Sequence, residues 1–386
     1  MKKNSAIVLI VFTVIIAIVL GQRFTGDDFS AGGGSASGGN LLRGGGTKTE
    51  TIAISNGETE GNTSFSTNGF DRLTTKEIMI TDGVKHSVPL SEIIGGGPPK
   101  DGIPSIDNPK FISVAEASKV LNDREPGIAL SVNGVDRFYP FQILVWHEIV
   151  NDQFPDGSGG SRRVLITYCP LCLSGIVFDP LVPAPSGVEG GGEPFGEAQG
   201  ERVEFGTSGK LWNSNLVMYD RKTDSLWSQI LGEAIVGSRT GTRLEVLPSD
   251  QIRFGDWRKL HPEAQVLSRD TGATRFYGQD PYGDYYTTPG TYFPVGKRDD
   301  RLNDKDFILG IVINGKAKAY WPEAVKKLGE VEDRFENKTI IVQYEKDIDA
   351  VRLFEKKSDG TLERINPFGS FWFSWVAAHP DTELLK

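Results

Sequence analysis

An internal repeat constrains the fold of this chain more than any other feature of the sequence. Residues 127–139 and residues 308–320 each read as a strand, an Asn-Gly turn and a second strand, which is the pattern of a β-hairpin. In each copy a short helix and two further strands follow, and each copy ends in a Trp-x3-His-Pro sequence, at Trp257 and at Trp375. We therefore predict an α+β, mainly β fold made of two unequal copies of a hairpin–helix–strands unit.

The two copies differ in length. We assign copy 1 to residues 126–270 and copy 2 to residues 306–386, with an aromatic, turn-rich connector at residues 271–305 between them. Copy 1 is longer because it carries a low-complexity insertion at residues 181–202 and further predicted strands after it. A turn-rich N-terminal extension of the folded region, residues 71–125, precedes copy 1.

The N-terminus predicts export. Within residues 1–25, two lysines precede an apolar run, residues 6–20, which is shorter than the roughly 20 residues that span a bilayer. Lysines before the run favour a cytoplasmic N-terminus. We expect a single-pass anchor in the cell membrane with an extracytoplasmic C-terminal domain, or a secreted protein if the run is a cleaved signal. Residues 26–70 are rich in Gly, Ser and Thr and predict a flexible spacer, with short strands near residues 50–54.

Composition excludes one class of partner and limits the chemistry. The net charge of -9 and the lack of a dense Lys/Arg cluster argue against a nucleic-acid partner, because phosphate binding needs a basic face. The membrane, contacted by the N-terminal segment, is the only partner that the sequence indicates. The chain has only 2 Cys and 4 His, so a metal or redox site must be built from very few residues.

The sharpest local signal is the Cys169-Pro-Leu-Cys172 sequence, which lies between two predicted strands. This spacing lets both sulfurs face one point, and three interpretations stay open. A thioredoxin-like redox centre needs the first cysteine at a helix N-terminus, whereas a strand follows here. A thiolate site for Zn²⁺ or Cu⁺ fits a Cys-x-x-Cys turn between strands but needs further ligands. A structural disulfide or a buried thiol pair is the third interpretation, since a thiol pair on the exported side can be oxidised.

His147 is the second candidate, because it lies at the end of the first predicted helix and close to the start of the cysteine strand. It could be a metal ligand or a general base, with Glu148, Asn151 or Asp152 orienting it. The structural alternative is a half-buried histidine with satisfied hydrogen bonds at a capped helix end. A hydrolase that uses His147 with Asp152 is a weaker hypothesis, since no nucleophile motif accompanies them.

Comparison of the two copies restricts where a site can lie. Copy 2 has neither His nor Cys at the aligned positions, and the pairs are His147/Leu328, Cys169/Glu345 and Cys172/Ile348. The unit therefore folds without these side chains, and any site is expected in copy 1. By contrast, His261 and His379 occupy the same place in both copies, where we predict helix C-terminal residues.

Five motifs carry a resemblance to a known family. They are residues 101–107 (DGIPSID), 146–152 (WHEIVND), 167–172 (TYCPLC), 213–221 (NSNLVMYDR) and 225–229 (SLWSQ). From about residue 101 to the C-terminus the chain resembles an exported family defined only as domain of unknown function 3179. In that family the cysteine pair is followed by Gly, where this chain has Leu173, which argues against a knuckle-type metal turn. The insertion at residues 181–202 looks foreign to the family, and the resemblance implies membership without an activity.

Two functional hypotheses remain from the sequence. The first is a metal-binding or thiol-dependent extracytoplasmic protein with a site at Cys169, Cys172 and His147. The second is a non-catalytic envelope or surface interaction module, in which a structural disulfide holds copy 1 together. No dinucleotide or phosphate-binding fingerprint is present, so we expect no nucleotide cofactor.

Overall fold

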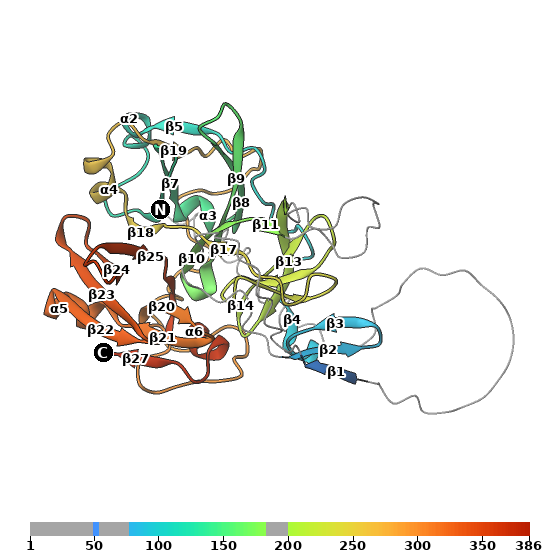
Figure 1. The fold of residues 1–386 in the computed structure, drawn as a ribbon. Coiled ribbons are helices and arrows are strands. Elements are labelled where there is room, and N and C mark those ends of the chain that lie inside the picture. Colours follow the sequence, from blue (N-terminus) through green and yellow to red (C-terminus); the bar gives the residue numbers. More distant parts are fainter. Residues whose placement is uncertain (1–48, 54–76, 183–199) are drawn as a thin grey trace, which may run out of the picture.

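The computed structural model describes residues 49–53, 77–182 and 200–386 (Figure 1). It is 44% strand and 13% helix, which confirms the predicted α+β, mainly β class. The predicted membrane segment and most of the insertion at residues 181–202 lie outside the described residues. In the described ranges, no helix has both the length and the apolar character needed to cross a bilayer.

A five-stranded sheet holds the first predicted hairpin. Its order is β18-β6-β7-β19-β5, and its strands are β5 (Phe111–Ser113), β6 (Pro126–Val132), β7 (Val135–Pro140), β18 (Asp250–Arg253) and β19 (Gln265–Leu267). Strand β18 is antiparallel to β6, and β19 is parallel to β7. Asn133 and Gly134 have φ angles of 49° and 78°, the left-handed backbone that a two-residue hairpin turn requires.

A four-stranded sheet in the second half has the same core arrangement. Its order is β26-β20-β21-β27, and its strands are β20 (Phe307–Ile313), β21 (Lys316–Tyr320), β26 (Phe368–Phe371) and β27 (Glu383–Leu385). Strand β26 is antiparallel to β20, and β27 is parallel to β21. The turn residues Asn314 and Gly315 have φ angles of 50° and 72°, so this hairpin closes in the same way.

A second sheet follows each hairpin. The first has the order β17-β10-β9-β8, with β8 (Ile149–Pro155), β9 (Ser161–Cys169), β10 (Ser174–Asp179) and β17 (Glu245–Val246). The other has the order β22-β23-β24-β25, with β22 (Glu330–Phe335), β23 (Lys338–Glu345), β24 (Ala350–Lys356) and β25 (Leu362–Ile365). A short 3-10 turn joins the central strands of each sheet, η2 (Pro170–Cys172) in the first and η3 (Lys346–Ile348) in the other.

Both 3-10 turns end on a left-handed residue. Leu173 has a φ of 48° and Asp349 a φ of 46°. Leu173 thus adopts the backbone conformation that glycine adopts most readily, and the absence of glycine does not prevent the turn. Leu173 therefore takes the left-handed backbone at which, as the sequence-based argument held, a glycine would relieve strain.

Most of the remaining strands form a large eight-stranded sheet. Its order is β1-β2-β3-β16-β15-β14-β13-β4, with β1 (Thr49–Ala53), β2 (Glu77–Thr81), β3 (Val84–His86), β4 (Ile93–Gly95), β13 (Phe205–Trp212), β14 (Asn215–Asp220), β15 (Leu226–Ser228) and β16 (Glu233–Val236). Strand β1 belongs to the predicted spacer, close to the short strands expected there. The ends of the insertion are held together because β11 (Leu181–Val182) pairs with β12 (Glu201–Arg202).

The helices are short. They are η1 (Leu90–Glu92), α2 (Val114–Ala117), α3 (Phe141–Leu144), α4 (Phe254–Leu260), α5 (Pro322–Leu328) and α6 (Trp372–Ala378). His261 and His379 are the C-cap residues of α4 and α6, as predicted.

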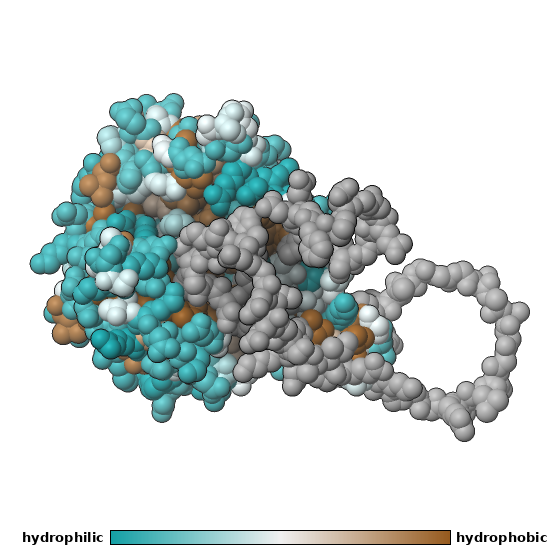
Figure 2. All heavy atoms as spheres, viewed as in Figure 1, coloured by the Kyte–Doolittle hydropathy of each residue, from teal (hydrophilic) through white to brown (hydrophobic). Residues whose placement is uncertain are grey.

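The two halves pack against each other in a reciprocal way (Figure 1). Cys172 of the first turn lies in the same hydrophobic core as Trp372 of α6, which belongs to the second half. Ile348 of the second turn lies in the same core as Trp257 of α4, which belongs to the first half. The face shown in Figure 2 is largely hydrophilic, with hydrophobic residues in small separate patches. Each 3-10 turn therefore lies in a hydrophobic core that also contains a helix of the other half.

Candidate cysteine site

Both cysteines lie on the turn between β9 and β10. Cys169 ends β9, Cys172 lies in η2, and both are buried free thiols. The Cys172 Sγ donates to the Ser214 carbonyl oxygen at 3.3 Å. The Tyr285 hydroxyl donates to the Leu171 carbonyl oxygen at 2.9 Å, so the connector covers the turn from outside.

The surroundings keep the Cys169 thiol protonated. Burial raises the pKa of Cys169 well above its ordinary value, and the neighbouring Cys172 thiol and Glu148 carboxyl raise it further. A hydrogen bond from the backbone N–H of Leu216 to the Cys169 sulfur acts to lower this pKa. A thiol with a raised pKa is a poor nucleophile. Because a strand also follows η2, where a thioredoxin-like centre has a helix, the site is not built for thiolate attack.

Glu148 contributes a carboxyl group to the surroundings of the cysteines. Its side chain is 7% exposed, and burial raises the pKa of Glu148 to about 8. It interacts electrostatically with Cys169 and with the hydroxyl of Tyr282. At neutral pH the carboxyl is therefore largely protonated and can donate a hydrogen bond.

Tyrosines of the connector, residues 271–305, complete the site. The sequence did not predict that these tyrosines belong to it. Tyr285 and Tyr286 have ring centroids 5.8 Å apart, and Tyr282 and Tyr285 have centroids 6.2 Å apart. Burial, followed by the proximity of the cysteines, raises the pKa of Tyr285. The only sequence signal was the aromatic composition of residues 271–305.

A buried network of amides and hydroxyls fixes the strands beside the cysteines. The Gln229 Nε2 donates to the Thr167 hydroxyl at 3.1 Å and to the Ser174 carbonyl oxygen at 2.9 Å. The Asn215 Nδ2 donates to the Gln229 Oε1 at 3.1 Å. Gln229 and Asn215 belong to the last two of the five motifs. These motifs therefore help to hold the cysteine turn in place.

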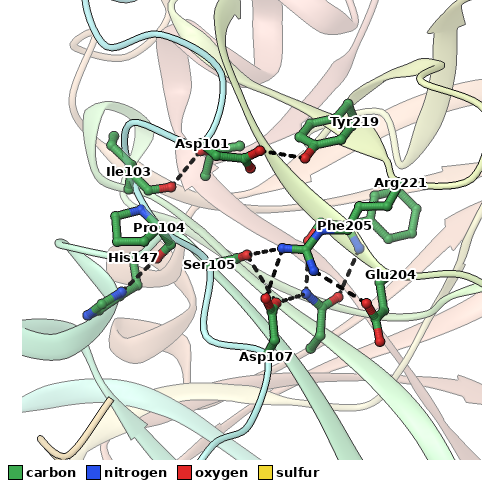
Figure 3. A network of polar contacts seen from close by, with 12 residues as sticks. Asp101, Ile103, Pro104, Ser105, Asp107, His147, Glu204, Phe205, Tyr219 and Arg221 are labelled. Atoms are coloured by element: carbon green, nitrogen blue, oxygen red, sulfur yellow. Dashed lines mark hydrogen bonds and ion pairs between the residues drawn. The ribbon is translucent and has the colours of Figure 1, made fainter. Parts of the chain in front are cut away.

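His147 forms hydrogen bonds with residues other than the cysteines. Its Nδ1 lies 2.7 Å from the Pro104 carbonyl oxygen, as Figure 3 shows, and its Nε2 lies 2.7 Å from the Tyr277 hydroxyl. Where the structure describes the chain, no three His, Cys, Asp or Glu side chains are grouped as a metal site would require. The described residues therefore do not place His147 with Cys169 and Cys172 as a third ligand.

Asn151 binds the segment that carries the first motif. Its Nδ2 donates to the Asp107 Oδ1 at 2.8 Å, and its Oδ1 accepts from the Phe205 N–H at 2.9 Å. Arg221 donates to the Asp107 Oδ2 at 2.9 Å and to the Ser105 hydroxyl at 2.8 Å (Figure 3). Residues 101–107 are thus fastened to the large sheet.

Asp152 forms contacts that recur in the second half. It accepts a hydrogen bond from Tyr139 and pairs with Arg137 at 2.8 Å. Asp333 likewise accepts from the Tyr320 hydroxyl at 2.9 Å and pairs with Lys318 at 2.7 Å. Because both halves contain this arrangement, it belongs to the fold of each half.

The fold and the site define a mainly β, α+β protein with a buried pair of free thiols on a 3-10 turn that ends on a left-handed residue. Residues 100–382 match a family described as protein of unknown function (DUF3179), and the chain belongs to this family. Comparison with curated proteins and with solved structures gave no match. The matched range contains the cysteine turn and all five motifs, and the family has no described activity, so the function has to be argued from the site itself.

Proposed function

We propose that Cys169 and Cys172 bind one Cu⁺ ion in an extracytoplasmic, membrane-tethered protein. One observation carries the metal assignment: a single 3-10 turn, which ends on the left-handed Leu173, presents two buried free thiols. Thiolates are soft ligands that select Cu⁺, Zn²⁺ or iron–sulfur clusters. Zn²⁺ takes three or four protein ligands, whereas Cu⁺ accepts two thiolates. Cu⁺ therefore fits this donor set better than Zn²⁺.

The protonation of the two thiols determines how Cu⁺ binding depends on pH. Binding of Cu⁺ displaces the protons of both thiols, so the affinity rises with pH. Two thiolates and one Cu⁺ together carry one negative charge, and its burial is opposed by the loss of solvation. The Leu216 N–H, which hydrogen bonds to Cys169, stabilises this charge.

An anaerobic competition titration tests the proposal. The reduced full chain is titrated with Cu⁺ against a chelator of known Cu⁺ affinity, and one Cu⁺ per chain is the expected result. Cys169→Ser and Cys172→Ser should each abolish competition, whereas Glu345→Ser, the matched change in the second half, should not. His147→Ala should also retain binding, because the described contacts of His147 lead elsewhere. Failure of the wild-type chain to compete better than the cysteine variants would reject the metal assignment.

The second candidate is a non-catalytic interaction module in which the cysteines serve only the core. It is favoured by the second half, where Ile348 fills the matching position of the turn in a hydrophobic core. A fold that accepts Ile at this position needs no metal there. The same titration separates the two candidates, since this one predicts that the chain binds no Cu⁺.

The location and the domain organisation are part of the proposal. The apolar run at residues 6–20 supports a single-pass anchor, and the net charge of -9 supports the absence of a nucleic-acid partner. The strand orders β18-β6-β7-β19 and β26-β20-β21-β27 support two copies of one unit at residues 126–270 and 306–386. Release of the protein from sedimented membranes when residues 1–25 are deleted would support the anchor, and unchanged sedimentation would reject it.

A further inference from the structure

The two thiols are closed off from solvent. Cys169 is 2% exposed and Cys172 is 0% exposed, and both lie in one hydrophobic core with Trp372 of α6 and Tyr285 of the connector. A metal ion or a thiol reagent can therefore reach them only after part of the fold has moved. Proteins open most readily where few backbone hydrogen bonds hold a segment in place. The segment that opens should be the least firmly held of those that cover the thiols.

The connector is held less firmly than the strands that carry the cysteines. Residues 271–305, all of which the structure describes, contain neither a helix nor a strand. The backbone hydrogen bonds within the connector close single turns, as from Thr288 N to Asp284 O at 3.1 Å. By contrast, β9 and β10 are paired along a continuous antiparallel ladder. The connector can therefore open at a lower cost in free energy than the strand pair.

Side chains fasten the middle of the connector to the cysteine turn. The Tyr285 hydroxyl donates to the carbonyl oxygen of Leu171, which lies between the two cysteines, at 2.9 Å. The Lys305 ammonium donates to the carbonyl oxygens of Tyr285 and Thr288, the second at 2.7 Å. It also lies 3.5 Å from the centroid of the Tyr285 ring. Lys305 thus holds the loop that presents Tyr285 to the turn.

Other contacts fasten the connector on either side of this loop. Before it, the Tyr277 hydroxyl lies 2.7 Å from the His147 Nε2. After it, the Gly296 N–H donates to the Asn213 Oδ1 at 2.8 Å. The loop is therefore a short span between two points that are attached to the first half.

Two glycines bound this span. Gly283 and Gly290 have φ angles of 57° and 86°, the left-handed backbone that glycine adopts at no steric cost. No atom lies within 4 Å of a Cβ built on either glycine, so neither is required for close packing. Loop residues that absorb a change of φ and ψ are the usual hinges of a moving segment. Gly283 and Gly290 are placed to act as hinges for residues 284–289.

We propose that residues 284–289 form a hinged cover, which turns at Gly283 and Gly290 and which opens the path from solvent to both thiols when Tyr285 leaves the cysteine turn. Opening breaks one hydrogen bond between the cover and the turn, and it leaves the β9–β10 ladder intact. This use of the cover for metal entry rests on the proposed function, in which the same path admits Cu⁺. The cover itself concerns only access to the thiols.

The rate of thiol alkylation tests the cover in the reduced, metal-free full chain. The chain has only 2 Cys, so the mass increase with N-ethylmaleimide reports these two thiols. Tyr285→Phe removes the hydrogen bond to the turn and should raise the rate about threefold to tenfold, as expected for one hydrogen bond of ordinary strength. Lys305→Met removes two hydrogen bonds to the cover and should raise the rate by about tenfold or more.

Tyr320→Phe is the matched control, because it removes a buried tyrosine hydroxyl that donates to Asp333 in the second half. It should leave the alkylation rate within about twofold of the wild type. In low concentrations of urea the wild-type rate should stay nearly constant, since local opening exposes little surface.

Three outcomes separate the cover from the alternatives. Equal rates for Tyr285→Phe and the wild type, or equal increases for Tyr285→Phe and Tyr320→Phe, would overturn the cover. A wild-type rate that rises with urea as steeply as global unfolding does would overturn it as well. Faster alkylation of Tyr285→Phe and Lys305→Met in a chain that binds no Cu⁺ would support the cover and reject only the proposed function.

Discussion

Replacing Glu148 by glutamine should change how the stability of the protein depends on pH. Burial raises the pKa of Glu148 to about 8 in the folded protein, against an ordinary value of 4.5 that applies to the unfolded chain. Between these values the folded state holds a proton that the unfolded state has lost. The contribution of Glu148 to stability is therefore fully present below pH 4.5 and is lost as the pH rises toward 8.

The size of the effect follows from the same two values. Each pKa unit corresponds to about 1.4 kcal/mol, so the free energy of unfolding should fall by about 4 kcal/mol between pH 5 and pH 8 through Glu148 alone. A glutamine side chain cannot titrate, so the Glu148→Gln variant lacks this fall. Relative to the wild type, the variant should gain about 4 kcal/mol over that interval.

Urea unfolding of the reduced, metal-free chain at pH 5, 6.5 and 8 measures this difference. The comparison at each pH cancels the other titrating groups, including His147, whose pKa burial lowers. A difference between variant and wild type that grows steadily with pH is the expected result. A constant difference across the three pH values would show that Glu148 is ionised in the folded protein and would refute the reasoning.

Three further changes test the assignment of residues to the fold. Asp152→Ala should lower the free energy of unfolding in urea by about 3–5 kcal/mol, because it leaves Arg137 buried without its carboxylate, and Cu⁺ binding should persist. Asp333→Ala should cost less, since Lys318 keeps a second ion pair; equal losses would contradict this. Deleting residues 184–199 should change the melting temperature by less than about 3 °C, because β11 and β12 already hold the ends of the loop together. A fall of many degrees would mean that the insertion is packed against the fold.

Local sequence patterns predicted the parts of the fold that local backbone chemistry determines. Asn133-Gly134 and Asn314-Gly315 specify their hairpins, because few residues accept left-handed backbone at two successive positions. His261 and His379 end their helices as expected, since a following proline stops a helix. The Cys-x-x-Cys sequence between two predicted strands likewise predicted that the cysteines lie on a tight turn.

The contacts around the cysteines could not be predicted from local sequence patterns. The Tyr285 hydroxyl reaches the Leu171 carbonyl oxygen across 114 positions, and Gln229 reaches Thr167 across 62 positions. No local period or motif spacing encodes such contacts. Glu148 was one of three residues considered as orienting His147, but His147 hydrogen bonds to Pro104 and Tyr277, and the Glu148 side chain acts electrostatically on Cys169.

X-ray absorption at the copper edge of the Cu⁺-loaded full chain tests the central claim most directly, because it reports the atoms bound to the metal. The account predicts two sulfur neighbours and no nitrogen neighbour, with the copper lost from Cys169→Ser and from Cys172→Ser. A nitrogen neighbour that disappears in His147→Ala, or copper that remains bound without either cysteine, would contradict it.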